Sequence, residues 1–139
     1  MLLVTDVTGA VGKAVLAELA KGPAPVRVLL QPGGELPLQA PNVQGVQVDP
    51  SDAGSLQRAV QGVEAIFLSW PFSPQLAEAH MRIVSAAKAA GVRRLVQLSG
   101  VGADPSSGAD HTVAEDCARS DLHALPENGA LHARILGDA

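Results

Sequence analysis

The first twelve residues constrain the fold of this chain more than any other stretch. A short apolar run, Met1 to Val4, leads into Thr8-Gly9-Ala10-Val11-Gly12 and then into a segment with helical spacing. This order predicts a buried strand, a tight turn and a helix. Unpaired backbone N–H groups and the positive end of the helix dipole would meet at that turn, where they favour a phosphate. We therefore predict a βαβ unit that binds the pyrophosphate of a dinucleotide. Gly9 would let the backbone approach the phosphate, and Gly12 would let the helix lie close to the strand.

The rest of the chain repeats this alternation of strand and helix. Further strands are predicted at 26–30, 43–48, 65–69, 95–99 and 131–136. Further helices are predicted from a cap at Ser51 or Asp52 to Val60, at 75–90 and at 111–119, with a Pro- and Gly-rich loop at 31–41. This pattern predicts an α/β fold: a three-layer, doubly wound parallel sheet with strand order 3-2-1-4-5-6.

Length and charge exclude several classes of protein. A chain of 139 residues predicts one domain, spanning 1–139, and a formal net charge of −4 argues against nucleic acid as a partner. No apolar run approaches the roughly eighteen residues of a membrane span, so we expect no membrane partner. The single cysteine, Cys117, excludes an intramolecular disulfide. We expect a cytoplasmic protein without a processing signal.

Two stretches of the sequence resemble a known family. The turn from Thr5 to Gly12 resembles the Thr-Gly-x-x-Gly-x-x-Gly signature of the NmrA-like, quinone-oxidoreductase-like branch of the atypical short-chain dehydrogenases. The segments 89–94 and 98–104 resemble the stretch around the fifth strand of that family. The resemblance implies a Rossmann-like domain that binds NADP or NAD. It runs from Met1 to about Arg119, the N-terminal half of the family, so we expect the family's C-terminal substrate region to be lacking.

One residue departs from the signature at its centre. Asp6 stands where the family has its first glycine. A carboxylate about 5 Å from a phosphate charge, at an effective dielectric of about 20, would be repelled by roughly 3 kcal/mol. This upper estimate corresponds to a loss of affinity on the order of a hundredfold. Asp6 could instead turn away, pair with Lys13, or hold a ribose hydroxyl through water.

The resemblance also implies which residues contact the cofactor. Gln31 follows the second strand, where the family commonly has arginine, and glutamine does not choose between NAD and NADP. Asp49 falls where the family places a Gly-Asp pair near the adenine, but it could equally be a turn residue before Pro50. The predicted cofactor-binding residues are Thr5, Val7, Thr8, Gly9, Ala10, Val11, Gly12, Gln31, Asp49, Ser69, Trp70 and Ser99.

Catalytic residues are harder to assign. Reductases of the wider superfamily use a Tyr-x-x-x-Lys pair, and this sequence has no tyrosine. The weak candidates are Ser99 and the pair His111 and Glu115, which lie four apart on one predicted helix face. His111 could also be a residue that starts the helix. No two histidines have the spacing of a helical ligand pair, so we predict no metal site.

Two hypotheses of function follow from these observations. In the first, the chain is an NAD(P)-binding protein of the family, an intact or degenerate oxidoreductase of the quinone-reductase type. Its partners would be the dinucleotide, a small quinone or carbonyl substrate, and a second copy in a homodimer that completes the pocket. In the second, it is a non-catalytic Rossmann domain that acts as a cofactor sensor or a protein-interaction module.

Overall fold

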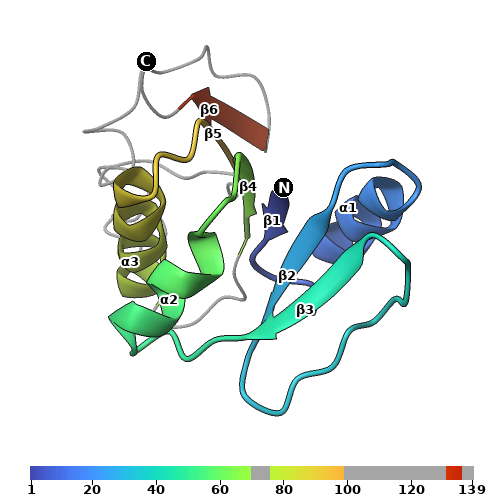
Figure 1. Ribbon diagram of the computed structural model, residues 1–139, viewed down its shortest axis with the longest axis horizontal. Coiled ribbons are helices and arrows are strands. Elements are labelled where there is room, and N and C mark those ends of the chain that lie inside the picture. Colours follow the sequence, from blue (N-terminus) through green and yellow to red (C-terminus); the bar gives the residue numbers. More distant parts are fainter. Residues whose placement is uncertain (70–75, 99–130, 136–139) are drawn as a thin grey trace.

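Strands and helices alternate along the chain in the computed structural model, which describes residues 1–69, 76–98 and 131–135 (Figure 1). The strands are β1 (Leu2–Val4), β2 (Val26–Leu30), β3 (Val43–Gln47), β4 (Ala65–Leu68), β5 (Arg94–Leu98) and β6 (Leu131–Ile135). The helices are α1 (Ala10–Ala20), α2 (Ala53–Val60) and α3 (Leu76–Ala89). These elements confirm the predicted ones to within a residue or two at each end. The predicted helix at 111–119 lies outside the described residues.

The strands form one sheet in the predicted order, β3-β2-β1-β4-β5-β6. The first five strands are parallel to one another. The sixth differs from the predicted parallel sheet, because β6 pairs antiparallel with β5. Period-two alternation reads the same in both directions along a strand, so the sequence pattern placed β6 at the edge without fixing its direction.

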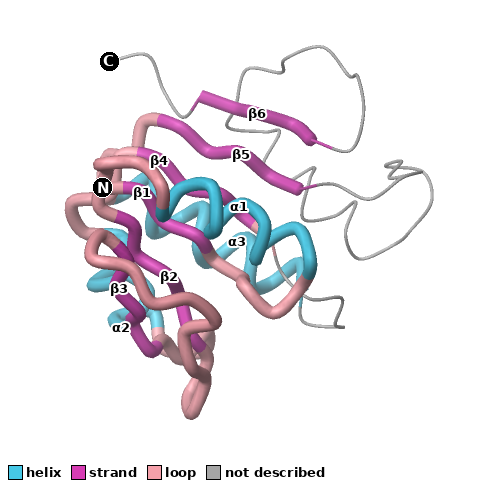
Figure 2. Tube along the Cα trace, turned by 90° about the vertical axis from the view of Figure 1, so that its right-hand side faces the viewer, coloured by secondary structure: helices cyan, strands magenta, loops and turns pink. Residues whose placement is uncertain are grey.

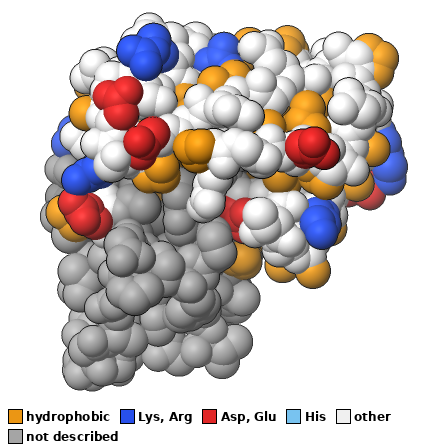
Figure 3. Space-filling view, turned by 90° about the horizontal axis from the view of Figure 1, so that it is seen from below, with side chains coloured by type: hydrophobic (Ala, Val, Ile, Leu, Met, Phe, Trp, Pro, Cys, Tyr) orange, Lys and Arg blue, Asp and Glu red, His pale blue; other side chains and the backbone are white. Residues whose placement is uncertain are grey.

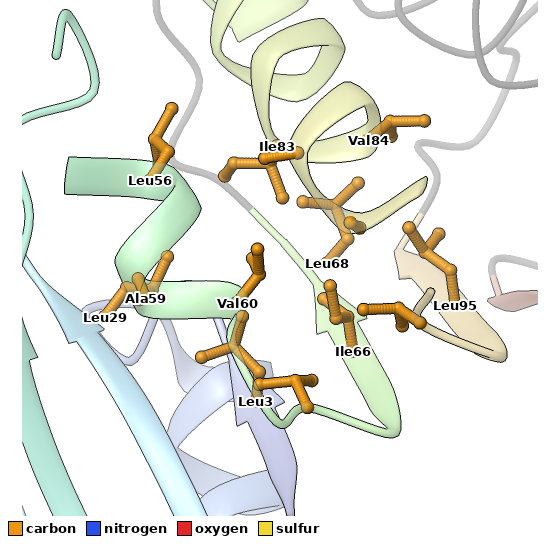
Figure 4. Close-up of a cluster of buried hydrophobic side chains, with 14 of the residues drawn as sticks. Leu3, Leu29, Leu56, Ala59, Val60, Ile66, Leu68, Ile83, Val84 and Leu95 are labelled. Carbon is orange, nitrogen blue, oxygen red and sulfur yellow. The ribbon is translucent and has the colours of Figure 1, made fainter. Parts of the chain in front are cut away.

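The sheet is covered on both faces, as the three-layer prediction requires. Figures 1 and 2 show α1 on one face and α2 and α3 on the other. Successive residues of β1 supply the two cores: Leu3 packs under α2 and α3, and Val4 packs under α1. The core under α2 and α3, shown in Figure 4, includes the fully buried Leu56, Ile66, Leu68, Ile83 and Leu95. Each such side chain contributes about 1.5–3 kcal/mol on burial.

The topology brings three loops together at one edge of the sheet. β1 lies between β2 and β4, and all three run in the same direction. Their carboxyl ends therefore meet, and the strand order reverses at β1. Such a switch point is where open α/β sheets bind ligands. Among the described helices, none is long and apolar enough to cross a bilayer.

Candidate dinucleotide-binding site

The turn after β1 is built around the carboxylate of Asp6. Its Oδ1 accepts hydrogen bonds from the backbone N–H of Thr8 (2.9 Å) and from the Thr8 hydroxyl (2.7 Å). This pattern is an Asx turn, in which the side chain replaces a backbone acceptor. Within the described residues Asp6 makes no ion pair with Lys13, one of the predicted alternatives. The carboxylate thus already accepts a hydrogen bond from one of the backbone N–H groups at the turn that is predicted to bind the phosphate.

Thr5 joins the ends of β1 and β4. Its backbone N–H donates to the carbonyl of Phe67 (3.1 Å). Its hydroxyl donates to the Ser69 carbonyl (2.5 Å) and accepts from the Ser69 N–H (3.0 Å). Thr5 and Ser69 are both buried, so the Thr5 side chain extends the β1–β4 ladder by one step. These hydrogen bonds hold the carboxyl ends of β1 and β4 together at the switch point.

The two glycines of the turn differ in what the fold requires of them. A Cβ on Gly12 would overlap the Asp6 carbonyl oxygen and lie 3.0 Å from its carbonyl carbon, so the predicted close approach of helix and strand is confirmed. Gly9 has φ −81° and ψ 164°, values open to any residue, and the nearest atom to its Cβ would be the Asp6 Oδ2 at 3.7 Å. The fold needs Gly12, whereas the space beside Gly9 is open to a ligand.

The N-terminus of α1 keeps its donors available. Gly9 is the N-cap, and no side chain caps the helix. The first helical bond runs from the Lys13 N–H to the Gly9 carbonyl (3.1 Å). The N–H groups of 10–12 have no acceptor within the helix, as at any helix start. Such a terminus carries partial positive charge and suits a phosphate.

A cavity of about 520 Å³ lies beside this turn. This volume is in the usual range of small-molecule sites. The cavity is lined by residues of the turn, of α1, and of the loop and strands beside it: Thr5, Asp6, Val7, Thr8, Lys13, Leu29, Leu30, Gln31, Pro32, Gly33, Gly34, Glu35, Pro37 and Val48. Four of the predicted cofactor-binding residues line it: Thr5, Val7, Thr8 and Gln31. Gly9, Ala10, Val11 and Gly12 form the adjoining helix start.

The loop after β2 forms the other wall. It is the irregular connection that its Pro and Gly content predicted. The Gly34 N–H donates to the Gln31 carbonyl (2.8 Å) and Gly33 has φ +80°, so Pro32 and Gly33 occupy the central positions of a tight turn that needs glycine second. This Pro-Gly pair was the signal that could have placed the residues after Gln31 in the site.

The remaining predicted residues separate into two groups. Asp49 and Ser69 lie at the same edge of the sheet but are not among the residues that line the cavity. Trp70, Ser99, His111 and Glu115 lie outside the described residues, so their roles stay predictions.

Asp49 stabilises a turn, which is one of the two roles predicted for it. Its Oδ1 accepts from the Ser51 hydroxyl (2.6 Å) and the Ser51 N–H (2.8 Å). These two hydrogen bonds, the hydroxyl first, lower the pKa of the Asp49 carboxyl, and the positive charge of Arg82 adds to the effect. Arg82 also donates to the Pro50 carbonyl (3.0 Å), which ties α3 to this turn. Contact of Asp49 with an adenine stays a prediction.

Charge around the site is mixed. Three of the residues that line the cavity are charged: Asp6, Lys13 and Glu35. In the view of Figure 3, acidic and basic side chains of the described residues lie interspersed, several acidic ones next to basic ones, among neutral and hydrophobic side chains. Such a surface lacks the basic stripe that nucleic-acid backbones require.

The reversal of strand order at β1, the uncapped start of α1 and the adjoining cavity together define a dinucleotide-binding α/β protein. Sequence comparison identifies the family. The NAD(P)H-binding family matches residues 7–125, and the chain belongs to it. This confirms the fold and the dinucleotide, NAD(P)H, that the opening turn predicted.

Individual relatives are reductases. The chain is 43% identical over 101 residues to a (4-alkanoyl-5-oxo-2,5-dihydrofuran-3-yl)methyl phosphate reductase of Streptomyces griseus, covering 71% of this chain and 34% of that protein. It is 36% identical to Quinone oxidoreductase 2 of Escherichia coli, covering all of this chain and 52% of that protein.

A solved structure agrees with these relatives. The crystal structure of an NADPH-dependent quinone oxidoreductase of Escherichia coli, complexed with NADPH, superposes with a TM-score of 0.75 at 31% identity. The superposition covers 86% of this chain and 45% of that one. The resemblance to quinone-oxidoreductase-like proteins is therefore confirmed. The chain spans about a third to a half of the length of these relatives.

Proposed function

We propose that this chain holds the pyrophosphate of NAD(P)H at the start of α1 and the adenosine half in the cavity beside it. The observation that carries the proposal is the uncapped N-terminus of α1, which has open space at Gly9 and adjoins a cavity of about 520 Å³. The N–H groups of 10–12 would donate to phosphate oxygens, and Gln31 would hydrogen-bond a ribose hydroxyl. Thr5 would hold the base of this site in place, because its hydroxyl joins the end of β1 to the end of β4.

We further propose that the protein is a reductase of the quinone-reductase type. The cofactor would supply a hydride, and the acceptor would be a quinone or another small carbonyl compound. Support comes from the names of the similar proteins, which include a quinone oxidoreductase and a (4-alkanoyl-5-oxo-2,5-dihydrofuran-3-yl)methyl phosphate reductase. The same proposal includes a homodimer that completes the substrate pocket. It also includes a cytoplasmic location, which suits a chain with one cysteine.

A second function is favoured by Asp6. Its carboxylate stands in the glycine position of the signature and already accepts from the Thr8 N–H. The sequence also has no tyrosine for proton transfer. These features fit a non-catalytic domain that senses the cofactor or binds another protein. The two functions share the binding site and differ in turnover.

Calorimetric titration of the full chain with NADH and with NADPH tests the binding site. We expect saturable binding, and a loss of at least about a hundredfold in Gly9→Glu, because the new carboxylate would occupy the phosphate position. Gly22→Glu is the matched control: it puts the same charge at the exposed far end of α1, where a Cβ meets no atom closer than 3.6 Å. Equal loss in both variants, or no binding by the wild type, would refute the site.

Turnover separates the two functions. A reductase should oxidise NADH or NADPH when a soluble quinone is added, at a rate that Gly9→Glu abolishes. Saturable cofactor binding without quinone-dependent oxidation would favour the sensor or interaction function.

A further inference from the structure

We infer that this site prefers NADH to NADPH and that Glu35 sets the preference, an inference that rests on the proposed function. The two cofactors differ at the adenosine ribose, where NADPH carries an additional phosphate of about −1.5 to −2 charges at neutral pH. The residues that follow the second strand usually decide between them. Gln31 at that position carries no charge, so the decision falls to the other residues of the cavity wall.

The wall formed by the loop after β2 carries a negative charge. Glu35 lines the cavity, and the segment 31–41 contains no lysine or arginine. The one cation among the described lining residues is Lys13, which belongs to α1, one turn after Gly9, and so to the wall of the proposed pyrophosphate site. The additional phosphate of NADPH would therefore face a carboxylate, and the wall formed by the loop after β2 would offer no lysine or arginine to pair with it.

The loop holds Glu35 in place. Before it, the turn closed by the Gly34 N–H and the Gln31 carbonyl (2.8 Å) fixes the direction of the chain. After it, Leu36 is partly buried and packs over β3. A Cβ on Gly45 would lie 3.1 Å from the Leu36 Cγ, so the absence of a side chain at Gly45 makes room for Leu36. These contacts fix the backbone on both sides of Glu35, so its exposed side chain extends from a defined position on the cavity wall.

The same two side chains suit an unmodified ribose. A carboxylate at Glu35 and the amide oxygen of Gln31 both accept hydrogen bonds, and a ribose hydroxyl can donate one. Replacing that hydroxyl by a phosphate removes the donor and adds like charge beside Glu35. The wall is therefore complementary to NADH and repels NADPH.

Paired titrations of the full chain with NADH and NADPH test this inference. In the wild type we expect NADH to bind about tenfold more tightly, and the difference to shrink as salt is raised. Glu35→Gln should strengthen NADPH binding by several-fold and change NADH binding little. Gln31→Arg should shift the preference toward NADPH by about tenfold or more, because a guanidinium pairs with phosphate.

Gln39→Arg is the matched control. It makes the same change in the same loop at an exposed residue that does not line the cavity, and it should leave the ratio of the two affinities unchanged. Equal or tighter binding of NADPH by the wild type would overturn the inference and leave the proposed function standing. A ratio that Glu35→Gln does not move would remove Glu35 from its role. No binding of either cofactor would overturn both.

Discussion

The turns after β1 and after β3 have the same local structure but different helices after them. Each begins with an aspartate whose Oδ1 accepts from the N–H and the hydroxyl two residues later. After β1 the pair is Asp6 and Thr8, with distances of 2.9 and 2.7 Å. After β3 it is Asp49 and Ser51, with distances of 2.8 and 2.6 Å. The aspartate turn itself therefore does not make a nucleotide site.

The difference lies in the next residues of each segment. The N-cap of α2 is Asp52, whose side chain accepts from the Gly54 N–H (2.9 Å), whereas the N-cap of α1 is Gly9, which caps nothing. At the third helical position, α2 has Ser55 and α1 has Gly12. The Ser55 hydroxyl accepts from the Asp49 N–H (3.4 Å), whereas Gly12 lets α1 touch the Asp6 carbonyl.

The start of α2 is thus capped by a side chain of its own segment, whereas the start of α1 has no side-chain cap. At α2 the Asp52 side chain accepts from one of the first N–H groups, that of Gly54, which favours stability. At α1 the sequence leaves these N–H groups for an external acceptor and draws the helix close to the strand, which favours binding. The two aspartates then have opposite consequences: Asp49 supports a structural turn after β3, whereas Asp6 would add unfavourable charge beside the proposed phosphate site after β1.

The largest effect is expected at the third helical position. Gly12→Ala should lower the free energy of unfolding by about 2–3 kcal/mol, because the new Cβ meets backbone that cannot move aside. Ser55→Ala, the matched change in α2, should stay within about 0.5 kcal/mol of the wild type, because a long hydrogen bond is exchanged for better helix propensity. Urea denaturation measures both. Equal costs would show that the close approach is not special to α1.

Removing the charge of Asp6 should change binding and little else. Asp6→Asn keeps an oxygen that can accept from Thr8 and removes the negative charge. We expect NADH and NADPH to bind about tenfold more tightly, less than the hundredfold upper estimate because Asp6 is only half-buried and solvent screens its charge. Asp52→Asn, which removes the same charge at the start of α2, should leave both affinities unchanged, since Asp52 does not line the cavity. Tighter binding in both variants would mean that overall charge, rather than position, controls affinity.

The sequence predicted the strands and helices because each depends on local patterns. It predicted the strand order because the alternation of strand and helix is typical of a doubly wound sheet. Apolar periodicity and the Asp52 cap are both read within a few residues. The part of the candidate site at the opening turn could be predicted as well, since the spacing of Gly9 and Gly12 is itself a local pattern. Glu35 was missed because its position depends on how the Leu36 side chain packs over Gly45, a contact between residues nine apart that no local pattern encodes. The direction of β6 was missed for the same kind of reason.

The cap of α2 should contribute a moderate amount to stability. Asp52→Ala should cost about 1 kcal/mol, because the Gly54 N–H loses its acceptor. Asp52→Asn keeps the acceptor and should cost a few tenths of a kcal/mol at most. The ion pair of Asp52 with Arg58 (3.7 Å) is exposed and adds little. Thermal unfolding of the two variants separates the cap from the charge. Equal losses would assign the effect to the ion pair and weaken the contrast between a closed and an open helix start.

The smallest effect is expected at the hydroxyl that stabilises the Asp49 turn. Ser51→Ala removes the stronger of the two hydrogen bonds, so the pKa of the Asp49 carboxyl should rise toward its ordinary value, and carboxyl NMR shifts across an acid titration would report it. Because the folded-state pKa is lowered, the turn stabilises the protein above the ordinary aspartate pKa. It loses that contribution as the pH falls through the folded-state pKa. Ser51→Ala should therefore be less sensitive to acid than the wild type. Arg82→Gln should raise the pKa of Asp49 by a smaller amount, since Arg82 lowers that pKa through its charge and not through a hydrogen bond to the carboxyl. A larger rise in Arg82→Gln than in Ser51→Ala would mean that α3, and not the turn itself, holds Asp49 in its charged form.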